Sequence, residues 1–506
     1  MRLKELIKDI KKKKVFNLNN FEVEGIAYDS RKIKENYIFV ALKGSKQDGH
    51  NFINEAIERG AKCIIVNKRP SIIPTDITEI VVEDTKRALS EIANTYYNFP
   101  SKKLNVVGIT GTNGKTTTSF IIKKILDEQG FNVGLIGTIW YEIGERKIVS
   151  TNTTPESLDL IEMFSEMVKT NCKWAVMEVS SHGIDQKRIE GIDFDVGIFT
   201  NIAPHEHLDY HKTFRNYLNA KLLFFTKYLK ESSKKEKYAI INLDSPYSKI
   251  FIKGCEKVGI KWISTGRNKN ANIKLISYNI EKEGNFLEVE IEKERLNFKS
   301  KISGLGNIYN LLNGIAFSYI YKVPYETIQK AFLKIENVPG RFEFINEGQD
   351  FSVIVDYAHT HHALHNLLLS VKNLKPRKII VIFGCGGDRD KSKRPLMGKI
   401  ATKMADFVII TSDNPRTEDP MKIIKDIENG IPFYLRKKYK IIPDRKKAIF
   451  EGISMAKTND CVVIAGKGHE AFQILKDVTI PFDDREEARK AIKEIINKKI
   501  IEEKLF

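Results

Sequence analysis

The chain has 506 residues, of which 42% are hydrophobic and 29% charged, and its formal net charge is +18. The length predicts about three domains, since a domain has roughly 100–200 residues, and the composition is typical of a globular protein. No apolar run approaches the roughly 18 residues of a membrane-spanning helix, and the N-terminus lacks the apolar core of a signal peptide, which argues against membrane insertion.

The positive charge raises the question of a nucleic-acid partner. Lysine occurs along the whole chain, with runs only at residues 11–14 and 232–237, and no aromatic residues are interleaved with these runs to form a stacking platform. We interpret the runs as solvated surface and expect no nucleic-acid binding.

Cysteine usage indicates the compartment. The chain has an odd number of cysteines and no CxxC spacing: Cys63, Cys172, Cys255, Cys385 and Cys461. This pattern argues against a disulfide framework and against a cysteine-based zinc site. We therefore expect a cytoplasmic protein in a reducing environment.

Residues 1–101 predict a small N-terminal α/β domain. Short apolar runs (GIAYDS, YIFVAL, KCIIV and EIVVE) alternate there with helical patterns at 52–60 and 86–97. The region ends in YYNFPSKK, where Pro100 with polar neighbours predicts a linker.

Residues 102–337 predict a central domain. From residue 104 apolar runs are followed by helical segments, first at LNVVGIT and then through NVGLIGT, WAVMEVS, VGIFTNI and YAIINLD. Such alternation predicts a mostly parallel sheet covered on both faces. A turn at Pro339–Gly340 marks a second break, and residues 338–506 alternate in the same way. The predicted fold class is therefore α/β, with three domains.

The segment VVGITGTNGKTTTSF predicts a phosphate loop between a strand and a helix. In this context backbone N–H groups and a helix N-terminus can cradle phosphates. Gly111 and Gly114 let the backbone curl close to an anion, Lys115 brings charge to the β- and γ-phosphates, and Thr116 can offer a hydroxyl to Mg²⁺. Although Ile109 replaces the first glycine of the strict GxxxxGK[ST] pattern, strand, turn, lysine and helix follow in order, so we predict nucleotide binding.

Two further strand ends carry residues that can bind a metal. WAVMEVSSHG places Glu178 and His182 after an apolar run, and GIFTNIAPHEHLDYH supplies Glu206, His207 and Asp209. Ligands collect at the carboxyl ends of strands in an open α/β sheet, so both loops should face the phosphate loop. Carboxylates and imidazole beside a nucleotide imply Mg²⁺ held jointly with the phosphates.

Zinc is the alternative, because histidines are dense at 205–211 and 359–365. No HExxH register occurs, and zinc requires no phosphate loop nearby, so the sequence favours magnesium.

Several motifs occur in an order that covers nearly the whole chain. They are GTNGKTT, MEVSSHGIDQKRI, HLDYHKTFRNYLNAK, GLGNIYNLLNGIA, VPGRFEF, DYAH, FGCGGDRDKSKRPLMG, TSDNPR and IAGKGHE. Together they resemble the Mur ligase family. The resemblance implies an N-terminal UDP-substrate-binding domain (1–101), a central ATPase domain (102–337) and a C-terminal Rossmann-like domain that binds the amino acid (338–506).

The resemblance also assigns residues to ligands. The implied ATP-binding residues are Gly111, Thr112, Asn113, Gly114, Lys115, Thr116, Thr117, Asn307, Asn310, Arg341 and Asp356. The implied UDP-muramyl-dipeptide residues are Tyr28, Ser30, Ser45, Lys46, Gln47, Asn152, Thr153, Thr154, Ser180, Gln186 and Arg188. The implied Mg²⁺ ligands are Thr116, Glu178, His207 and a carbamylated Lys221, and the implied catalytic residues are Lys115, Glu178, His207 and Lys221.

TSDNPR, which follows the apolar run ADFVII, resembles the loop that reads the incoming amino acid, in the form associated with meso-diaminopimelate. Arg416 could grip the second carboxylate of this diamino acid, which lysine lacks, with two parallel hydrogen bonds. From spacing alone, a surface salt bridge of Arg416 with Glu418 or Asp419 is the favoured interpretation. The implied diaminopimelate-binding residues are Arg389, Asp413, Asn414, Pro415, Arg416, Gly466 and Glu470.

The implied activity is that of an ADP-forming ligase of peptidoglycan precursor synthesis. It would add meso-diaminopimelate, or an analogue such as lanthionine, to the D-glutamate of UDP-N-acetylmuramoyl-L-Ala-D-Glu through an acyl phosphate. The alternatives are the L-lysine-adding ligases of the family and, more remotely, a folylpolyglutamate synthetase. ATP and Mg²⁺ are the implied cofactors, and a monomer with only small-molecule partners is expected. No general base is evident, with Asp209 and His211 as weak candidates.

Two departures from the family pattern are visible in the sequence. His361 and His362 follow Thr360, where the family continues with proline and aspartate, and Glu206 replaces a frequent aspartate. Neither change affects the implied catalytic residues.

Overall fold

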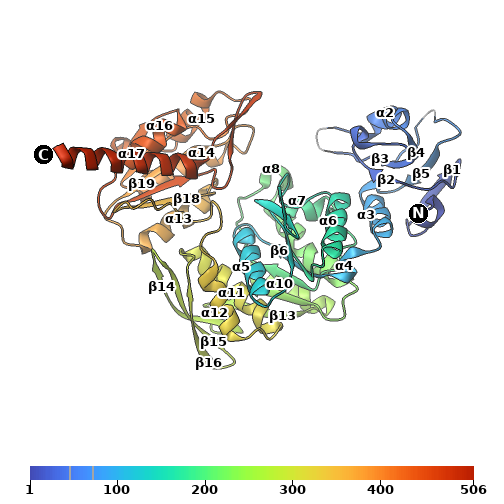
Figure 1. The fold of residues 1–506 in the computed structure, drawn as a ribbon, viewed down its shortest axis with the longest axis horizontal. Coiled ribbons are helices and arrows are strands. Elements are labelled where there is room, and N and C mark those ends of the chain that lie inside the picture. Colours follow the sequence, from blue (N-terminus) through green and yellow to red (C-terminus); the bar gives the residue numbers. More distant parts are fainter. Residues whose placement is uncertain (45–46, 71–72, 506) are drawn as a thin grey trace.

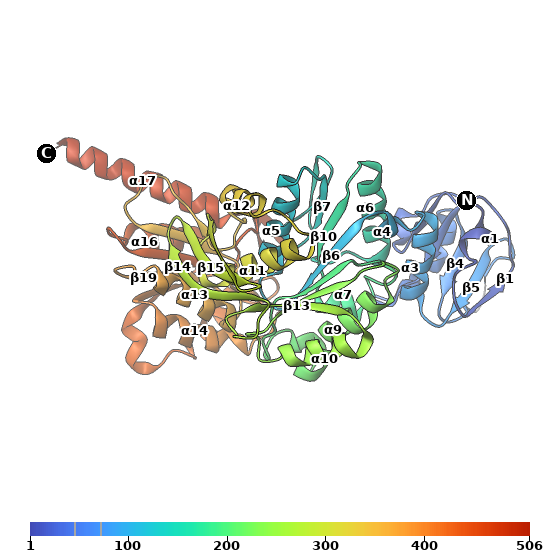
Figure 2. The same cartoon turned by 90° about the horizontal axis from the view of Figure 1, so that it is seen from below.

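The computed structural model describes residues 1–44, 47–70 and 73–505. Three α/β domains follow one another along the molecule, with the N-terminal and C-terminal strands on opposite sides of the central sheet (Figures 1 and 2). The predicted fold class is therefore confirmed. None of the helices in the described ranges combines the length and the apolar character that crossing a membrane requires.

The N-terminal sheet has the order β1-β5-β4-β3-β2, in which only β1 runs antiparallel to its neighbour. Its strands are β1 (Lys13–Phe16), β2 (Gly25–Ala27), β3 (Tyr37–Val40), β4 (Ala61–Val66) and β5 (Thr78–Val82). Its helices are α1 (Leu3–Leu6), η1 (Ser30–Lys32), η2 (Gly49–Phe52), α2 (Ile53–Glu58) and α3 (Thr85–Tyr96). Helix α3 begins after Asp84, whose carboxylate accepts from two free N–H groups of the first turn. The strands and helices predicted for this region are confirmed.

The predicted linker contains a short helix, α4 (Pro100–Lys103). Proline suits the first position of a helix because the N–H that it lacks would have no partner there. The preceding residue, Phe99, is left-handed with φ 49°, which turns the chain into the central domain.

The central sheet has eleven strands in the order β16-β15-β14-β13-β12-β11-β6-β10-β7-β8-β9. The strands are β6 (Asn105–Thr110), β7 (Val133–Ile136), β8 (Trp140–Ile143), β9 (Arg146–Val149), β10 (Trp174–Glu178), β11 (Val196–Phe199), β12 (Tyr238–Asn242), β13 (Lys261–Gly266), β14 (Ile273–Glu281), β15 (Gly284–Ile291) and β16 (Glu294–Ser300). The seven neighbours from β14 to β7 pair in parallel, as predicted, whereas β15, β16, β8 and β9 extend both edges as antiparallel hairpins. These hairpins were not predicted.

Helices cover both faces of the central sheet. They are α5 (Lys115–Glu128), α6 (Ser157–Lys169), α7 (Ser181–Asp185), α8 (Leu208–His211), α9 (Phe214–Leu223), the π-helix η3 (Phe224–Leu229), α10 (Ser248–Val258), α11 (Leu305–Ile320) and α12 (Tyr325–Lys334). Successive residues of β6 point to opposite faces. Val107 packs in one core with α5, α11 and α12, while Val106 packs with α6 and with the N-terminal helix α3. The N-terminal core is thus continuous with one face of the central sheet.

The turn predicted at Pro339–Gly340 is confirmed, because Arg341 N–H donates to the carbonyl of Val338 at 3.0 Å. Gly340 has φ 64°, and a Cβ there would lie 2.1 Å from the backbone nitrogen of His469. Only glycine fits this left-handed close approach. The turn therefore holds Arg341 against the loop that contains His469.

The C-terminal sheet has the order β17-β18-β22-β19-β20-β21, and all pairs except β17–β18 are parallel. The strands, with a separate hairpin β23–β24, are β17 (Glu343–Phe344), β18 (Ser352–Asp356), β19 (Ile379–Phe383), β20 (Phe407–Ile410), β21 (Tyr439–Ile441), β22 (Cys461–Ala465), β23 (Phe472–Leu475) and β24 (Val478–Pro481). The helices are α13 (His361–Asn373), α14 (Lys393–Met404), α15 (Pro420–Glu428), η4 (Phe433–Lys438), α16 (Arg445–Ser454) and α17 (Asp484–Leu505). One face packs on α13, α14 and α15, and the other on α16 and α17.

Candidate active site

Two cavities lie between the central and C-terminal domains, with volumes of about 550 and 710 Å³. Both are lined by Lys115, Glu206 and His207, so they meet at the phosphate loop. We call the first the nucleotide cavity and the second the acceptor cavity. A substrate group in the acceptor cavity can therefore approach a phosphate held by the loop.

The phosphate loop connects β6 to α5 as predicted. Gly114 has φ 87°, and a Cβ on it would lie 2.4 Å from Asn310 Oδ1, which explains why a glycine precedes the helix. Lys115 Nζ donates to the carbonyls of Gly111 and Thr112, each at 3.0 Å. Burial lowers the pKa of Lys115. Its ammonium group is thus held over the loop, where an anion would stabilise it.

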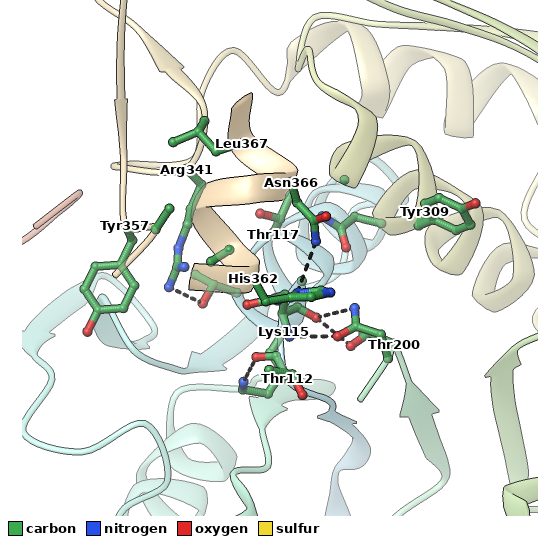
Figure 3. Close-up of a pocket in the computed structure, with 18 of the residues that line it drawn as sticks. Thr112, Lys115, Thr117, Thr200, Tyr309, Arg341, Tyr357, His362, Asn366 and Leu367 are labelled. Carbon is green, nitrogen blue, oxygen red and sulfur yellow. Dashed lines mark hydrogen bonds between the residues drawn. The ribbon is translucent and has the colours of Figure 1, made fainter. Parts of the chain in front are cut away.

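The loop that follows β10 faces the phosphate loop, as its place at a strand end predicted. Glu178 is buried, and its Oε1 accepts from Thr116 Oγ at 2.9 Å and from Thr138 N–H at 2.7 Å. Thr116 Oγ also accepts from Arg341 Nη2 at 3.2 Å. Figure 3 shows the Arg341 side chain reaching from the C-terminal side toward the loop that holds Thr112 and Lys115.

Lys221 comes from α9 and is only 1% exposed. Its Nζ donates to the carbonyl of Gly111 at 2.8 Å and lies 4.8 Å from the centre of the Tyr217 ring. No carboxylate lies within ion-pair distance of Lys221 in the described part of the chain. Burial, together with the charge of Lys115, lowers the pKa of Lys221 well below its ordinary value. An uncharged amine is therefore favoured at this position.

The histidines form a ring cluster beside Lys221. The ring centres of His182 and His207 lie 5.2 Å apart, and those of His182 and His211 lie 5.5 Å apart. Burial lowers the pKa of all three imidazoles, so they are neutral and can act as ligands. Across residues 1–44, 47–70 and 73–505, however, no three or more His, Cys, Asp or Glu side chains are arranged to hold a metal ion.

The far side of the nucleotide cavity is built by α11 and the start of the C-terminal domain. Asn310 Nδ2 donates to Asn307 Oδ1 at 3.0 Å, and Asn310 Oδ1 accepts from the hydroxyl of Thr118 on α5 at 3.2 Å. Asp356, at the end of β18, accepts from two backbone N–H groups at 2.7 and 2.8 Å. Of the residues that the family resemblance assigned to ATP, those lining this cavity are Thr112, Asn113, Gly114, Lys115, Thr116, Thr117, Asn307, Asn310, Arg341 and Asp356, and Gly111 lines the acceptor cavity.

One wall of the acceptor cavity contains predicted muramyl-dipeptide residues, namely Asn152, Thr153, Thr154, Ser180 and Arg188. Arg188 donates to the carbonyl of Thr154 at 2.8 Å and to Gln186 Oε1 at 2.7 Å, which holds its guanidinium in place. Gln186 is therefore adjacent to the cavity rather than in its lining.

The residues predicted for the uridine end lie elsewhere. The Tyr28 hydroxyl donates to Asp159 of α6 at 2.5 Å, and the Ser30 hydroxyl donates to Glu55 at 3.0 Å. Neither these two residues nor Gln47 lines the two cavities. Ser45 and Lys46 lie outside the described residues.

Three loops of the C-terminal domain form the opposite wall of the acceptor cavity. They contribute six of the seven residues predicted for diaminopimelate: Arg389, Asp413, Asn414, Arg416, Gly466 and Glu470. Pro415 is outside the lining. Asn414 Nδ2 donates to Glu470 Oε2 at 2.9 Å, and the buried Lys467 joins both side chains at 3.1 and 3.2 Å.

Arg416 is held in place by its backbone hydrogen bonds and by one nitrogen of its guanidinium group, the planar fork of its side chain. Its φ is 53°, its N–H donates to the carbonyl of Ile474, and its own carbonyl accepts from the N–H of Lys476 at 2.9 Å. Its Nη1 donates to the carbonyl of Gly387 at 2.7 Å. Burial, with a smaller effect of Arg389, lowers the pKa of Arg416. Two neighbouring guanidinium groups in a partly buried wall favour an anionic ligand.

The surface salt bridge that spacing favoured for Arg416 is wrong. Glu418 pairs instead with Arg394 at 2.8 Å, and the Asp419 carboxylate accepts from Met421 N–H at the start of α15. Within the described ranges Arg416 has no carboxylate in ion-pair distance. The remaining donors of its fork are thus available to a ligand in the cavity.

Several lining residues were not predicted as ligands. Thr138, Asn201 and Asn242 line the nucleotide cavity, and each is at or just beyond the carboxyl end of a strand of the parallel sheet or its hairpin edge. Their position at the ends of predicted strands is the feature of the sequence that could have indicated them as ligands. Lys393 and Asp390 of the acceptor cavity belong to a motif that was quoted only for Arg389. The histidines from His359 to His362 line the two cavities, without a role that their spacing could have indicated.

Comparisons with known proteins cover most of the chain. Three family models match: "Mur ligase family, catalytic domain" at residues 22–97, "Mur ligase middle domain" at 109–318, and "Mur ligase, glutamate ligase domain" at 340–468. A UDP-N-acetylmuramoyl-L-alanyl-D-glutamate–2,6-diaminopimelate ligase of Clostridium tetani is 42% identical over 98% of this chain and 100% of its own length. The protein of the same name from Clostridium perfringens is 43% identical over 96% of this chain and 98% of its own.

A solved structure with that ligase name is similar in fold. It has 30% sequence identity and a TM-score of 0.66, and the match covers 93% of this chain and 95% of the other.

Proposed function

Because this chain belongs to the Mur ligase family, we propose that it is the ATP-dependent ligase that adds meso-2,6-diaminopimelate to the D-glutamate of UDP-N-acetylmuramoyl-L-Ala-D-Glu. The observation that carries the choice of amino acid is the Arg416 guanidinium, which pairs with no carboxylate of the described residues and lines the cavity that meets the phosphate loop. Residues 1–101, 102–337 and 338–506 would be the domains for the UDP-substrate, for ATP and for the amino acid.

The nucleotide cavity would hold ATP with its γ-phosphate at Lys115. An oxygen of the D-glutamate γ-carboxylate attacks the γ-phosphorus, the bond to the β-phosphate oxygen breaks, and ADP leaves an acyl phosphate behind. Lys115 supplies charge where it develops on the transferring group, and the N–H groups at the start of α5 supply further donors. The lowered pKa of Lys115 is consistent with this role, since an incoming phosphate would restore the charged form.

The acceptor cavity would hold the other two reactants. The amine nitrogen of the diamino acid attacks the acyl carbon, the bond to the phosphate oxygen breaks, and the nitrogen loses a proton as the amide forms. Asn152, Thr154, Ser180 and Arg188 would bind the muramyl-dipeptide on one wall. The second carboxylate of the diamino acid would meet Arg416 on the other wall, and Asp413 and Asn414 would meet its ammonium group.

The side chains around Thr116 fit magnesium bound together with phosphates. Glu178 is a buried carboxylate whose hydrogen bonds orient it toward the phosphate loop, and His207, whose pKa burial lowers, lines the same cavity. Mg²⁺ is usually held by one or two carboxylates and by substrate phosphates, so a complete protein cage is not required. When bound, Mg²⁺ neutralises charge on the phosphates. Thr116, Glu178, His207 and Lys221 would hold it.

Lys221 would take part as a carbamate. Its neutral amine can attack the carbon of CO₂ and lose one proton, which converts the neutral amine into an anionic carbamate with oxygen atoms as ligands. Lys221 is buried, has no ion-pair partner among the described residues and has a strongly lowered pKa, and these three features support the modification.

The test is ADP release by the purified protein with ATP, Mg²⁺ and UDP-N-acetylmuramoyl-L-Ala-D-Glu. The amino acids compared are meso-diaminopimelate, lanthionine and L-lysine. We expect turnover with the first two, which share a second carboxylate, and a much lower kcat/KM with lysine. Equal kcat/KM with lysine would contradict the role of Arg416. The absence of ADP release with all three would contradict the ligase itself.

The remaining expectations on partners stay predictions from the sequence. They are a monomer that acts on small molecules, without nucleic acid, in the cytoplasm.

A further inference from the structure

Two of the loops at the acceptor cavity form one unit. They are residues 384–392, after β19, and 411–419, after β20. The N–H of Gly387 donates to the carbonyl of Asn414 at 2.9 Å, and the hydroxyl of Thr417 donates to the Asp388 carboxylate at 2.7 Å. Arg416 belongs to this unit, so whatever fixes the two loops also fixes Arg416.

Arg394 fixes them from the side that faces away from the cavity. It lies in the first turn of α14, and its side chain is 0% exposed. Its two terminal nitrogens donate to the two carboxylate oxygens of Glu418 at 3.0 and 2.8 Å, and Nη1 also donates to Asp426 of α15 at 2.9 Å. A planar fork paired in this bidentate way holds its partner in one orientation.

The peptide segment 386–388 lies between this ion pair and Arg416. At one end of the segment a carbonyl accepts from Arg394 at 3.3 Å, and at the other end an N–H donates to Glu418 at 2.7 Å. The carbonyl between them, that of Gly387, accepts from Arg416 Nη1 at 2.7 Å. The ion pair therefore fixes both neighbours of the oxygen that orients the Arg416 fork.

We propose that Arg394 and Glu418 are positioning residues that set where Arg416 meets the second carboxylate of the diamino acid. This inference rests on the proposed function. Neither residue lines the two cavities, so both act through the segment 386–388 and not by touching a substrate. A displacement of about 1 Å at a reacting or binding group can cost about a hundredfold, so loosening this segment weakens capture of the diamino acid.

The variant Arg394→Met tests the inference in the ADP-release assay. We expect the KM for meso-diaminopimelate to rise about tenfold. The KM for ATP and for the UDP-muramyl-dipeptide should stay within about twofold, because the nucleotide cavity and the opposite wall of the acceptor cavity are untouched. Arg394→Lys keeps the charge and part of the hydrogen bonding. Its KM for meso-diaminopimelate should lie between those of the wild-type protein and Arg394→Met. Glu418→Gln keeps the shape of the side chain, so its KM for meso-diaminopimelate should rise less than that of Arg394→Met.

Arg377→Gln is the matched control. Arg377 pairs with the buried Asp460 at 2.7 Å in the same domain, but the two residues precede β19 and β22, at the strand ends opposite the cavity. We expect this variant to lower the thermal midpoint of unfolding, Tm, without changing the KM for the diamino acid.

Three outcomes would overturn the inference: an unchanged KM for meso-diaminopimelate in all the Arg394 and Glu418 variants, an equal rise in all three KM values, or the same rise in Arg377→Gln. If Arg394→Met does not fold, the Arg394→Lys and Glu418→Gln variants decide by the same criteria. If the wild-type protein does not use meso-diaminopimelate, the proposed function fails first, and this inference fails with it.

Discussion

The nucleotide end and the amino-acid end of the cleft are built in different ways. The phosphate-binding part of the nucleotide end is one continuous segment, residues 110–118, in which strand, turn and helix follow directly. The amino-acid end is assembled from loops at 384–392, 411–419 and 466–470, and buried ion pairs and side-chain hydrogen bonds hold them together. The shared function, phosphate binding, thus depends on local chain geometry, whereas the choice of amino acid depends on side chains that meet only in the folded protein.

The largest expected effect is in Lys221→Ala, next to the phosphate loop, where Lys221 Nζ donates to the carbonyl of Gly111. If a carbamate at Lys221 supplies a metal ligand, the variant should lose about a thousandfold in kcat, because charge on the transferring phosphate is no longer neutralised. Added formate or acetate should restore part of the activity by occupying the space of the missing carboxylate. The measurement is kcat for ADP release with and without these acids.

Lys227→Ala is the control for this variant. Lys227 lies in the next turns of the chain and pairs with Glu190 at 2.6 Å, outside both cavities. The Lys227→Ala variant should retain the kcat of the wild-type protein, and added formate or acetate should not change it. Full activity of Lys221→Ala would show that no carbamate is needed. Of the features at the phosphate loop, only the loop itself would then distinguish the nucleotide end from the amino-acid end.

The two ends also differ in what the sequence could predict. The phosphate loop was predictable, because the segment from β6 to α5 contains its own strand, its glycines and its lysine in one run. That Arg416 lacks an ion pair with Glu418 or Asp419 was not predictable. Both carboxylates follow it closely in sequence, and only the fold shows that Arg394 and the start of α15 engage them. The role of Lys221 likewise required the family resemblance, since nothing in its spacing indicates a buried lysine that lacks an ion pair with any described residue.

A similar limit applies to the fold. The parallel strands β6, β7, β10, β11 and β12 are almost fully buried and appear as apolar runs, so they were predicted. The parallel strands β13 and β14 carry exposed polar residues and were not predicted. The edge hairpin β15–β16 contains many charged residues and has one exposed face, and its pattern therefore resembles a solvated segment.

The second prediction concerns the amino-acid end, in Arg416→Met. Loss of a charge-assisted hydrogen-bond pair costs about 2–3 kcal/mol, so kcat/KM for meso-diaminopimelate should fall about a hundredfold. The kcat/KM for L-lysine should change little, because lysine has no second carboxylate for Arg416 to bind. The measurement is the ratio of the two kcat/KM values.

Arg436→Met provides the matched control. Arg436 is an exposed arginine of η4 in the same domain and lines neither cavity. The ratio of kcat/KM for meso-diaminopimelate to kcat/KM for L-lysine in Arg436→Met should equal that of the wild-type protein. A parallel fall for both amino acids in Arg416→Met would mean that this residue supports the loop and does not read the second carboxylate.

The smallest effect is a pH dependence of stability at the amino-acid end. Hydrogen bonds from Arg394, opposed by burial, lower the pKa of Glu418 from an ordinary value of 4.5 to about 2 in the folded protein. A carboxyl group with a lowered folded pKa stabilises the fold fully above its unfolded pKa and loses this contribution as the pH falls toward the folded pKa. The Tm difference between the wild-type protein and Glu418→Gln should therefore be constant above about pH 5 and shrink between pH 4.5 and 2.

Glu451→Gln is the comparison for that titration, since Glu451 pairs with Lys440 at the protein surface. Exposed pairs contribute about 0–1 kcal/mol, so its effect on Tm should be small throughout the range. A Tm difference for Glu418→Gln that is the same at pH 3.5 and pH 6 would mean that the folded protein does not favour the ionised carboxylate. The pair with Arg394 would then be too weak to fix segment 386–388, and the amino-acid end would depend on its backbone hydrogen bonds, as the nucleotide end does.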